Sequence, residues 1–168
     1  MIEVAPRLFV GSQTDYETQA KDDNSWTVVQ ACKEPYHRAA LGYTGRAARN
    51  DHPEYLFCKR DNRLILNLVD VDDPQYVRPE IIDAALACIH LNLSSLAPSR
   101  QRVLVHCNQG RSRSPTIAML HLAKALPVDF ERAEEAFAAI YPDYAPANGM
   151  REFARGRWPT LHTQRAEE

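Results

Sequence analysis

The sequence has no long apolar run: no segment approaches the ~18 consecutive apolar residues of a membrane-spanning helix. Its first residues, MIEVAPRLFVG, also lack the basic-then-apolar pattern of a secretory signal peptide. The chain carries little excess charge of either sign, because its formal net charge is −2. That charge gives no overall reason to bind nucleic acid or an anionic membrane. We therefore expect a cytoplasmic protein without a membrane partner.

The sequence is also poor in cysteine, with 4 among 168 residues and no CxxC pair. This pattern predicts reduced thiols and does not resemble a zinc site, so we expect no metal and no other cofactor. Cys88, in an apolar helical run, and Cys32, at the end of a strand-like run, are interpreted as small buried hydrophobic residues. Cys107 differs from them because of the residues that surround it.

Apolar residues make up 45% of the chain and charged residues 25%, which indicates a globule with one core. A length of 168 residues favours a single domain over 1–168. Short β-rich runs alternate with segments of helical apolar spacing, which predicts an α/β domain with helices on both faces of a sheet. The expected strands are Arg7–Gly11, Thr27–Cys32, Leu64–Val69 and Val103–His106, and the expected helices are Pro79–Leu93, Pro115–Leu126, Phe130–Tyr141 and Gly149–Arg155.

Residues 33–63 fit this scheme poorly, because they are polar and show no sustained period. We call this segment the insert. It contains 7 Lys and Arg residues against 4 Asp and Glu residues, so it is locally +3. Loops of this length without secondary structure are uncommon and often functional. The insert is interpreted either as a solvated excursion with a short helix or as a loop that faces an anionic substrate.

The segment His106–Ser114 reads HCNQGRSRS and lies between an apolar strand and Pro115, a residue typical of a first helical turn. We expect Ser114 to cap that helix. A strand, a tight loop and a helix N-terminus together form an anion cradle, because backbone N–H groups and the helix dipole both attract negative charge. Gly110 suits a place where a Cβ would obstruct the backbone.

The same field would stabilise a thiolate on Cys107, ready to attack phosphorus. Arg113, six positions later in the sequence, supplies a fork of donors that matches two phosphoryl oxygens. Ser112 or Ser114 can hydrogen-bond the sulfur and stabilise it as a leaving group. Two interpretations of His106 stand: it donates to the Cys107 backbone and tunes the thiolate, or it only fills the end of the strand.

The segment HCNQGRSRS resembles the HCxxGxSRS signature of the dual-specificity subgroup of protein tyrosine phosphatases, and every fixed position matches. Arg7–Ser12 is similar to the opening strand of that family, and Pro146–Met150 resembles its closing PNxGF region, whereas the insert departs from the compact pattern. The resemblance implies a protein tyrosine phosphatase-like fold with a mixed, mainly parallel central sheet. It also implies a phosphocysteine intermediate and no metal.

Carried onto this chain, the resemblance implies that Cys107 is the nucleophile and Arg113 the phosphate clamp. It implies that the Ser114 hydroxyl assists breakdown of the phosphoenzyme and that Asn148 braces the loop. The phosphate loop, which would bind the substrate phosphoryl group, then comprises Asn108, Gln109, Gly110, Arg111, Ser112 and Arg113.

Expulsion of an alkoxide or phenolate requires a proton donor, which in the resembling family is an Asp on a loop. Asp70, Asp72 and Asp73 follow the expected strand Leu64–Val69 and precede Pro74. Laying this segment onto the family's strand, loop and helix without a gap implies that Asp72 is the acid. Asp73 is the second choice and Asp70 the third, and both are otherwise interpreted as turn or capping residues.

The resemblance implies that the substrate is a phosphorylated protein or peptide carrying phosphotyrosine, and phosphoserine or phosphothreonine as well. Tyr16, Tyr36 and Tyr43 are candidates for an aromatic wall. Neutral Asn108 and Gln109 argue against a phosphoinositide substrate, because relatives that use one carry lysines in the loop. The alternatives are an RNA 5′-triphosphatase, or another phosphatase of non-protein phosphoesters, and a phosphate-binding module without turnover.

Overall fold

The computed structural model describes residues 1–94, 101–123 and 128–163. Its centre is a six-stranded sheet in the order β1-β2-β6-β3-β5-β4. The inner strands β2, β6, β3 and β5 are parallel, and each edge strand pairs antiparallel with its neighbour. The predicted mixed, mainly parallel sheet is confirmed. The strands are β1 (Ile2–Ala5), β2 (Leu8–Ser12), β3 (Trp26–Gln30), β4 (Phe57–Arg60), β5 (Arg63–Leu66) and β6 (Arg102–Cys107).

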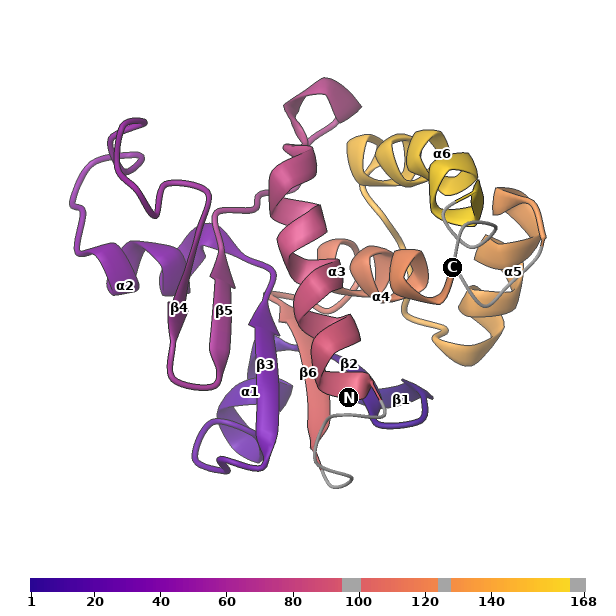
Figure 1. The fold of residues 1–168 in the computed structure, drawn as a ribbon, viewed down its shortest axis with the longest axis horizontal. Coiled ribbons are helices and arrows are strands. Elements are labelled where there is room, and N and C mark those ends of the chain that lie inside the picture. The colour runs from indigo at the N-terminus through magenta and orange to yellow at the C-terminus, as the bar shows by residue number, and fades with distance from the viewer. Residues whose placement is uncertain (95–100, 124–127, 164–168) are drawn as a thin grey trace.

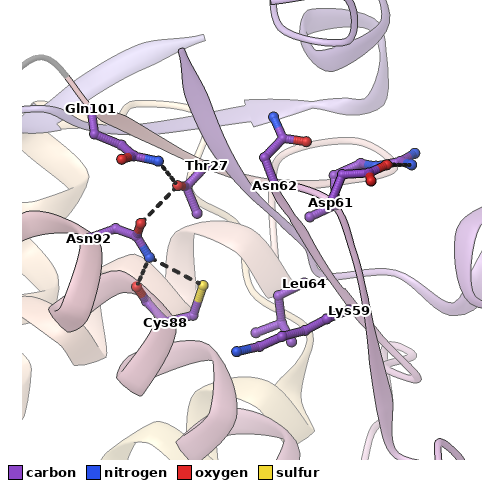
Figure 2. A pocket seen from close by; sticks show the side chains of 9 residues that line it. Thr27, Lys59, Asp61, Asn62, Leu64, Cys88, Asn92 and Gln101 are labelled. Atoms are coloured by element: carbon purple, nitrogen blue, oxygen red, sulfur yellow. Dashed lines mark hydrogen bonds and ion pairs between the residues drawn. The ribbon is translucent and has the colours of Figure 1, made fainter. Parts of the chain in front are cut away.

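Helices cover both faces of the sheet, as expected for an α/β fold (Figure 1). On one face, Leu104 of β6 packs with Tyr16 of α1 and with Ala20, the residue just after this helix. On the other face, Val103 and Val105 belong to the larger core beneath α3 and α4. This alternation along β6 follows the two-residue side-chain period of a strand. The helices are α1 (Gln13–Gln19), α2 (Arg38–Leu41), α3 (Pro79–Leu93), α4 (Arg113–Leu122), α5 (Phe130–Ile140) and α6 (Asn148–Thr163), with a short 3-10 turn, η2, at Pro74–Tyr76.

The parallel inner strands end at one edge of the sheet, and the loops that leave them meet there. Cys107 ends β6 and is in register with Ser12, the last residue of β2. On the other side, the N–H of Ala31, just after β3, donates to the His106 carbonyl at 2.7 Å. Ligands of α/β sheets bind at this carboxyl edge. The fold therefore places the segment that follows Cys107 where a ligand site is expected.

The predicted strands lie close to β2, β3, β5 and β6, and the predicted helix Pro79–Leu93 coincides with α3. Two helix boundaries were wrong. The helix predicted from Pro115 begins at Arg113, and the last residues of its predicted span lie outside the described residues. The helix predicted at Gly149–Arg155 continues to Thr163. Trp158 and Leu161 are buried in its second half, so core packing maintains the helix through Pro159.

The insert contains the edge strand β4, which was not predicted, and the helix α2, which one of its two interpretations expected as a short helix without placing it. His37 anchors it: the imidazole is fully buried, and its Nε2 lies 3.0 Å from the Glu54 carbonyl oxygen. Burial lowers the pKa of His37, which favours the neutral ring that this contact accommodates. The sequence signals for β4 and α2 were too short to outweigh the polar composition around them.

Most of the insert's positive charge is neutralised locally. Each of its acidic residues forms an ion pair with one of its arginines, so the excess charge rests on Lys33, Arg46 and Lys59. The Lys33 ammonium donates to the Arg46 carbonyl. The ion pairs are Arg38–Glu34, Arg49–Asp51, Arg60–Glu54 and Arg63–Asp61.

Within the described ranges, no helix combines the length and apolar character that crossing a membrane requires.

Candidate active site

The phosphate loop joins the end of β6 to the start of α4. Gly110 occupies the left-handed region at φ 72°, which glycine adopts without a steric penalty. A Cβ at this position would lie 2.9 Å from both the backbone carbon and the oxygen of Gly11. The loop therefore needs glycine for two independent reasons, its backbone conformation and its close approach to β2.

Neighbouring segments hold the loop through its carbonyl groups. The Tyr141 hydroxyl donates to the Gly110 carbonyl at 2.8 Å, and the Ala145 N–H donates to the Arg111 carbonyl at 2.8 Å. The Gln13 N–H donates to the Asn108 carbonyl at 3.1 Å. By contrast, the N–H groups of the four residues after Asn108 have no acceptor among the described residues. The amides of Gln109, Gly110, Arg111 and Ser112 are thus available to an oxyanion.

Cys107 lies at the base of this loop. Its residue is 1% exposed, yet it lines a cavity of about 600 Å³ together with the loop and the segment 145–147. The Ser114 hydroxyl lies 3.2 Å from the Cys107 sulfur and 3.2 Å from the Gly11 carbonyl oxygen. The predicted contact between this serine and the nucleophile is present. The predicted cap is not, because Ser112 is the N-cap residue of α4 and Ser114 lies in the first turn.

Arg113 begins α4 and reaches back across the loop, and its residue is 9% exposed. Its Nη1 donates to the Leu68 carbonyl at 3.1 Å, and its Nη2 donates to Asn108 Oδ1 at 2.8 Å. Its Nε lies 2.9 Å from Asp70 Oδ2. The Nε–H does not point along that line, so this contact is an ion pair and not a hydrogen bond. The guanidinium therefore faces the same cavity as Cys107, as the sequence predicted.

His106 lies on the opposite face of the sheet from the cavity, between aromatic rings. Its ring stacks on Tyr16 with centroids 4.7 Å apart, and Tyr36 packs edge-on against it at 5.2 Å. Burial lowers the pKa of His106 to about 4, although the Cys107 backbone and nearby acids oppose this shift. Neither ring nitrogen forms a hydrogen bond of normal geometry with the described residues. The His106 side chain thus fills the end of β6 as a neutral imidazole. A role for His106 in tuning the Cys107 thiolate stays a prediction.

The expected aromatic wall is not formed. Tyr16 and Tyr36 pack around His106, and Tyr43 packs against His37 within the insert. No aromatic side chain is among the described residues that line the cavity. The interpretation of these tyrosines as walls of the catalytic pocket was wrong, because each of them is held by its own local cluster.

The three candidate acids occupy different environments. Asp70 lines the cavity and accepts a 2.5 Å hydrogen bond from the Ser112 hydroxyl. Asp73 caps the 3-10 turn η2 by accepting from the Gln75 N–H at 3.0 Å, as its alternative interpretation predicted. The Asp72 side chain is exposed and forms no hydrogen bond or ion pair with the described residues. Asp72 as the acid stays a prediction, and the structure does not place its carboxylate among the cavity residues.

Asn148 was expected to brace the phosphate loop, but its side chain donates to the Asp72 carbonyl at 3.0 Å. It therefore holds the loop of the candidate acids. The adjacent Gly149 has the same role, since its N–H donates to the Val71 carbonyl at 2.9 Å and a Cβ would lie 2.3 Å from that oxygen. The residue before Asn148 braces the phosphate loop instead, because the Ala147 N–H donates to the Ser112 hydroxyl at 3.0 Å.

Sequence reasoning missed Tyr141, Leu68 and Gly11 as parts of the site. Tyr141 and Leu68 act through a hydroxyl and a carbonyl group that reach the loop from distant segments, so no local pattern marks them. A glycine at the end of a strand was the available signal for Gly11, because such a residue often marks a close backbone approach. Among the described residues, no group of three or more His, Cys, Asp or Glu side chains is placed to hold a metal ion.

Comparison with known proteins gives a result from structure and none from sequence. No family model matches the sequence, and no curated protein sequence matches it. Among solved structures, PTPMT1 is 21% identical, with a TM-score of 0.65 and coverage of 99% of each chain. DUSP15 is 19% identical, with a TM-score of 0.62 and coverage of 100% of this chain and 96% of the other. Human DUSP28 is 18% identical, with a TM-score of 0.62 and coverage of 98% and 99%, respectively.

The chain therefore has the fold of the protein tyrosine phosphatases. The similar structures include DUSP15 and DUSP28, which agrees with the fold that the resemblance of HCNQGRSRS to the dual-specificity signature implied.

Proposed function

We propose that this protein is a cysteine-dependent phosphatase that forms a phosphocysteine on Cys107. The observation that carries the proposal is the position of the Cys107 sulfur, 3.2 Å from the Ser114 hydroxyl, in a cavity that it shares with the Arg113 guanidinium. A thiolate, a guanidinium fork and uncommitted loop amides supply a nucleophile and donors for the equatorial phosphoryl oxygens. A sulfur that only packed in a core would not need these partners.

The reaction would proceed in two displacements on phosphorus. The Cys107 thiolate attacks, the S–P bond forms and the ester P–O bond breaks, and an acid gives its proton to the leaving oxygen. Water then attacks the phosphocysteine and gives a proton to the acid deprotonated in the first step, and the S–P bond breaks while the Ser114 hydroxyl stabilises the departing thiolate. Asp72 is the acid that the sequence favours, and its exposed side chain, which has no partner among the described residues, is free to move toward the leaving group.

We further propose phosphorylated proteins or peptides as substrates, with phosphotyrosine and phosphoserine or phosphothreonine both accepted. The small residues Ala145, Pro146 and Ala147 on one side of the cavity support this breadth, because a pocket without an aromatic slot does not select strongly for a phenyl ring. Most of the arginines in the insert form ion pairs with its acidic residues, which leaves little free positive charge to bind a polyphosphate. This weakens the alternative that the protein is an RNA 5′-triphosphatase.

A substrate panel tests the proposal. The panel contains a phosphotyrosine peptide, the same peptide with phosphothreonine, a 5′-triphosphorylated RNA and a phosphoinositide. The last is included because one similar structure is PTPMT1 in complex with PI(5)P. We expect phosphate release from both peptides, and none from any substrate with Cys107→Ser. Preferential release from the RNA or the lipid would overturn the proposed substrate class while leaving the chemistry intact.

The proton donor is tested by dependence on the leaving group. Asp72→Asn should slow aryl phosphates with poor leaving groups by about 10²–10⁴-fold and those with good leaving groups far less, because only poor ones need the proton. Asp73→Asn is the matched control, since asparagine can retain the cap of η2. If Asp73→Asn or Asp70→Asn shows this selectivity and Asp72→Asn does not, the assignment of the acid is wrong.

A further inference from the structure

The guanidinium of Arg113 has one group fixed by the backbone and one edge held only by side chains. Its Nη1 donates to the Leu68 carbonyl in a buried contact of 3.1 Å. The edge formed by Nε and Nη2 faces Asp70 Oδ2 at 2.9 Å and Asn108 Oδ1 at 2.8 Å. The Leu68 carbonyl is held in place by the Lys33 N–H, which donates to it at 2.9 Å, so it cannot move aside as a side chain can. A phosphoryl group can therefore replace the present partners of Arg113 only along the edge formed by Nε and Nη2.

Both side chains on this edge line the cavity that contains Cys107. A phosphoryl group attacked by the Cys107 sulfur and bound bidentately by Arg113 would need the same two N–H groups. Asn108 Oδ1 accepts a hydrogen bond from Nη2, and Asp70 Oδ2 lies beside Nε as its ion-pair partner, so both side chains occupy the space that two phosphoryl oxygens would enter. Asn108 is neutral, whereas Asp70 carries the same sign of charge as the substrate.

Resting on the proposed phosphatase function, we propose that Asp70 is an internal competitor of the substrate phosphoryl group. Its carboxylate occupies the exchangeable edge of Arg113 and keeps that guanidinium oriented toward the cavity. When the phosphoryl group binds, Asp70 has to leave this edge, because a carboxylate and a phosphoryl dianion repel each other at contact distance. Asp70 is in this account a positioning residue that is displaced before the chemistry.

The surroundings of Asp70 allow a side-chain movement without a change of the backbone. The next two residues are fixed, since the Val71 carbonyl accepts from Gly149 and the Asp72 carbonyl accepts from Asn148. The Asp70 side chain itself is 38% exposed, so it can rotate toward solvent. The Ser112 hydroxyl that binds Asp70 also accepts from the Ala147 N–H, and it can turn its proton toward a phosphoryl oxygen once Asp70 has left.

The test measures binding without turnover. In a Cys107→Ser background, the dissociation constant for inorganic phosphate is measured by titration calorimetry with Asp70 intact and with Asp70→Asn. We expect Asp70→Asn to bind phosphate at least about tenfold more tightly, because removal of a like charge outweighs the loss of an ion pair. A residue that only supported the loop would weaken binding when it is replaced. Asp73→Asn, which removes the same charge outside the cavity, should change the constant by less than about twofold.

Unchanged or weaker phosphate binding by Asp70→Asn, or an equal gain with Asp73→Asn, would overturn the proposal. A second measurement covers a variant that does not fold: in the Cys107→Ser protein with Asp70 intact, phosphate should shift the NMR signal of the Arg113 Nε–H, and no shift would contradict the exchange. Failure of the phosphatase proposal is distinguishable, because it would appear as absent turnover by the native protein while these binding results stand.

Discussion

Replacement of Arg113 by lysine tests the clamp, because lysine retains the charge and loses the fork. A lysine ammonium cannot replace the three contacts of the guanidinium with Leu68, Asn108 and Asp70, nor offer two parallel N–H groups to a phosphoryl group. Each hydrogen bond to a charged group contributes about 1.5–3 kcal/mol, so loss of two costs about 3–6 kcal/mol of transition-state stabilisation. We therefore expect kcat/KM to fall by about 10²–10⁴-fold.

The assay is steady-state hydrolysis of an aryl phosphate, with Arg132→Lys as the matched control. Arg132 is an exposed residue of α5 that does not line the cavity, and lysine retains the charge that faces Asp129. Its replacement should change kcat/KM by less than about threefold. Thermal unfolding of both variants shows whether Arg113→Lys also destabilises the fold, because it removes one of the two donors to the Leu68 carbonyl. If Arg113→Lys retains activity within threefold of Arg132→Lys, the guanidinium is not the clamp and the account of the site is wrong.

Three further predictions follow from individual contacts. Ser114→Ala should slow breakdown of the phosphoenzyme more than its formation, so pre-steady-state kinetics should show a burst of the leaving group. A variant that shows no burst and has an unchanged kcat would contradict the role of this hydroxyl. Gly110→Ala should lower the free energy of unfolding by about 1–2 kcal/mol for the left-handed backbone, and further because of the clash with Gly11. Gly42 has φ 71° and no atom within 4 Å of the position that a Cβ would take, so Gly42→Ala should show the backbone effect alone. Equal losses of stability in denaturant unfolding would rule out the clash. Burial lowers the pKa of His106 to about 4 in the folded state, so the unfolded chain binds more protons than the folded one between pH 6.5 and 4. The free energy of unfolding should therefore fall by about 3 kcal/mol as the pH decreases through that window. His106→Gln should remove this dependence, and an unchanged slope in unfolding measurements would refute the buried, neutral ring.

The sequence was sufficient to predict the parts of the fold that local patterns encode. Apolar runs marked the inner strands, and the spacing in Pro79–Leu93 marked α3. The helix α1 was missed although it carries a capping box, in which the Asp15 carboxylate accepts from the Ser12 N–H at 2.8 Å. Its few turns contain mostly polar residues, so the apolar period was too weak to indicate it.

The nucleophile and the clamp could be predicted for a similar reason. Cys107, Gly110 and Arg113 lie in one short segment, and the strand-to-helix turn around them is encoded locally. The partners that hold the segment in shape could not be predicted, because Tyr141, Leu68 and Asp70 reach it only through tertiary packing. For the same reason, the ranking of the carboxylates by alignment did not anticipate that Asp70 is the one that contacts Arg113.

The central claim is that the Cys107 sulfur carries the phosphoryl group during turnover. Its most direct test is to mix the Ser114→Ala variant with a ³²P-labelled phosphopeptide, quench with SDS at neutral to alkaline pH and map the labelled peptide. The account predicts close to one phosphate per chain on Cys107, and none in the Cys107→Ser protein treated in the same way. Turnover with no label on Cys107 after this quench, or with label on another residue, would contradict it.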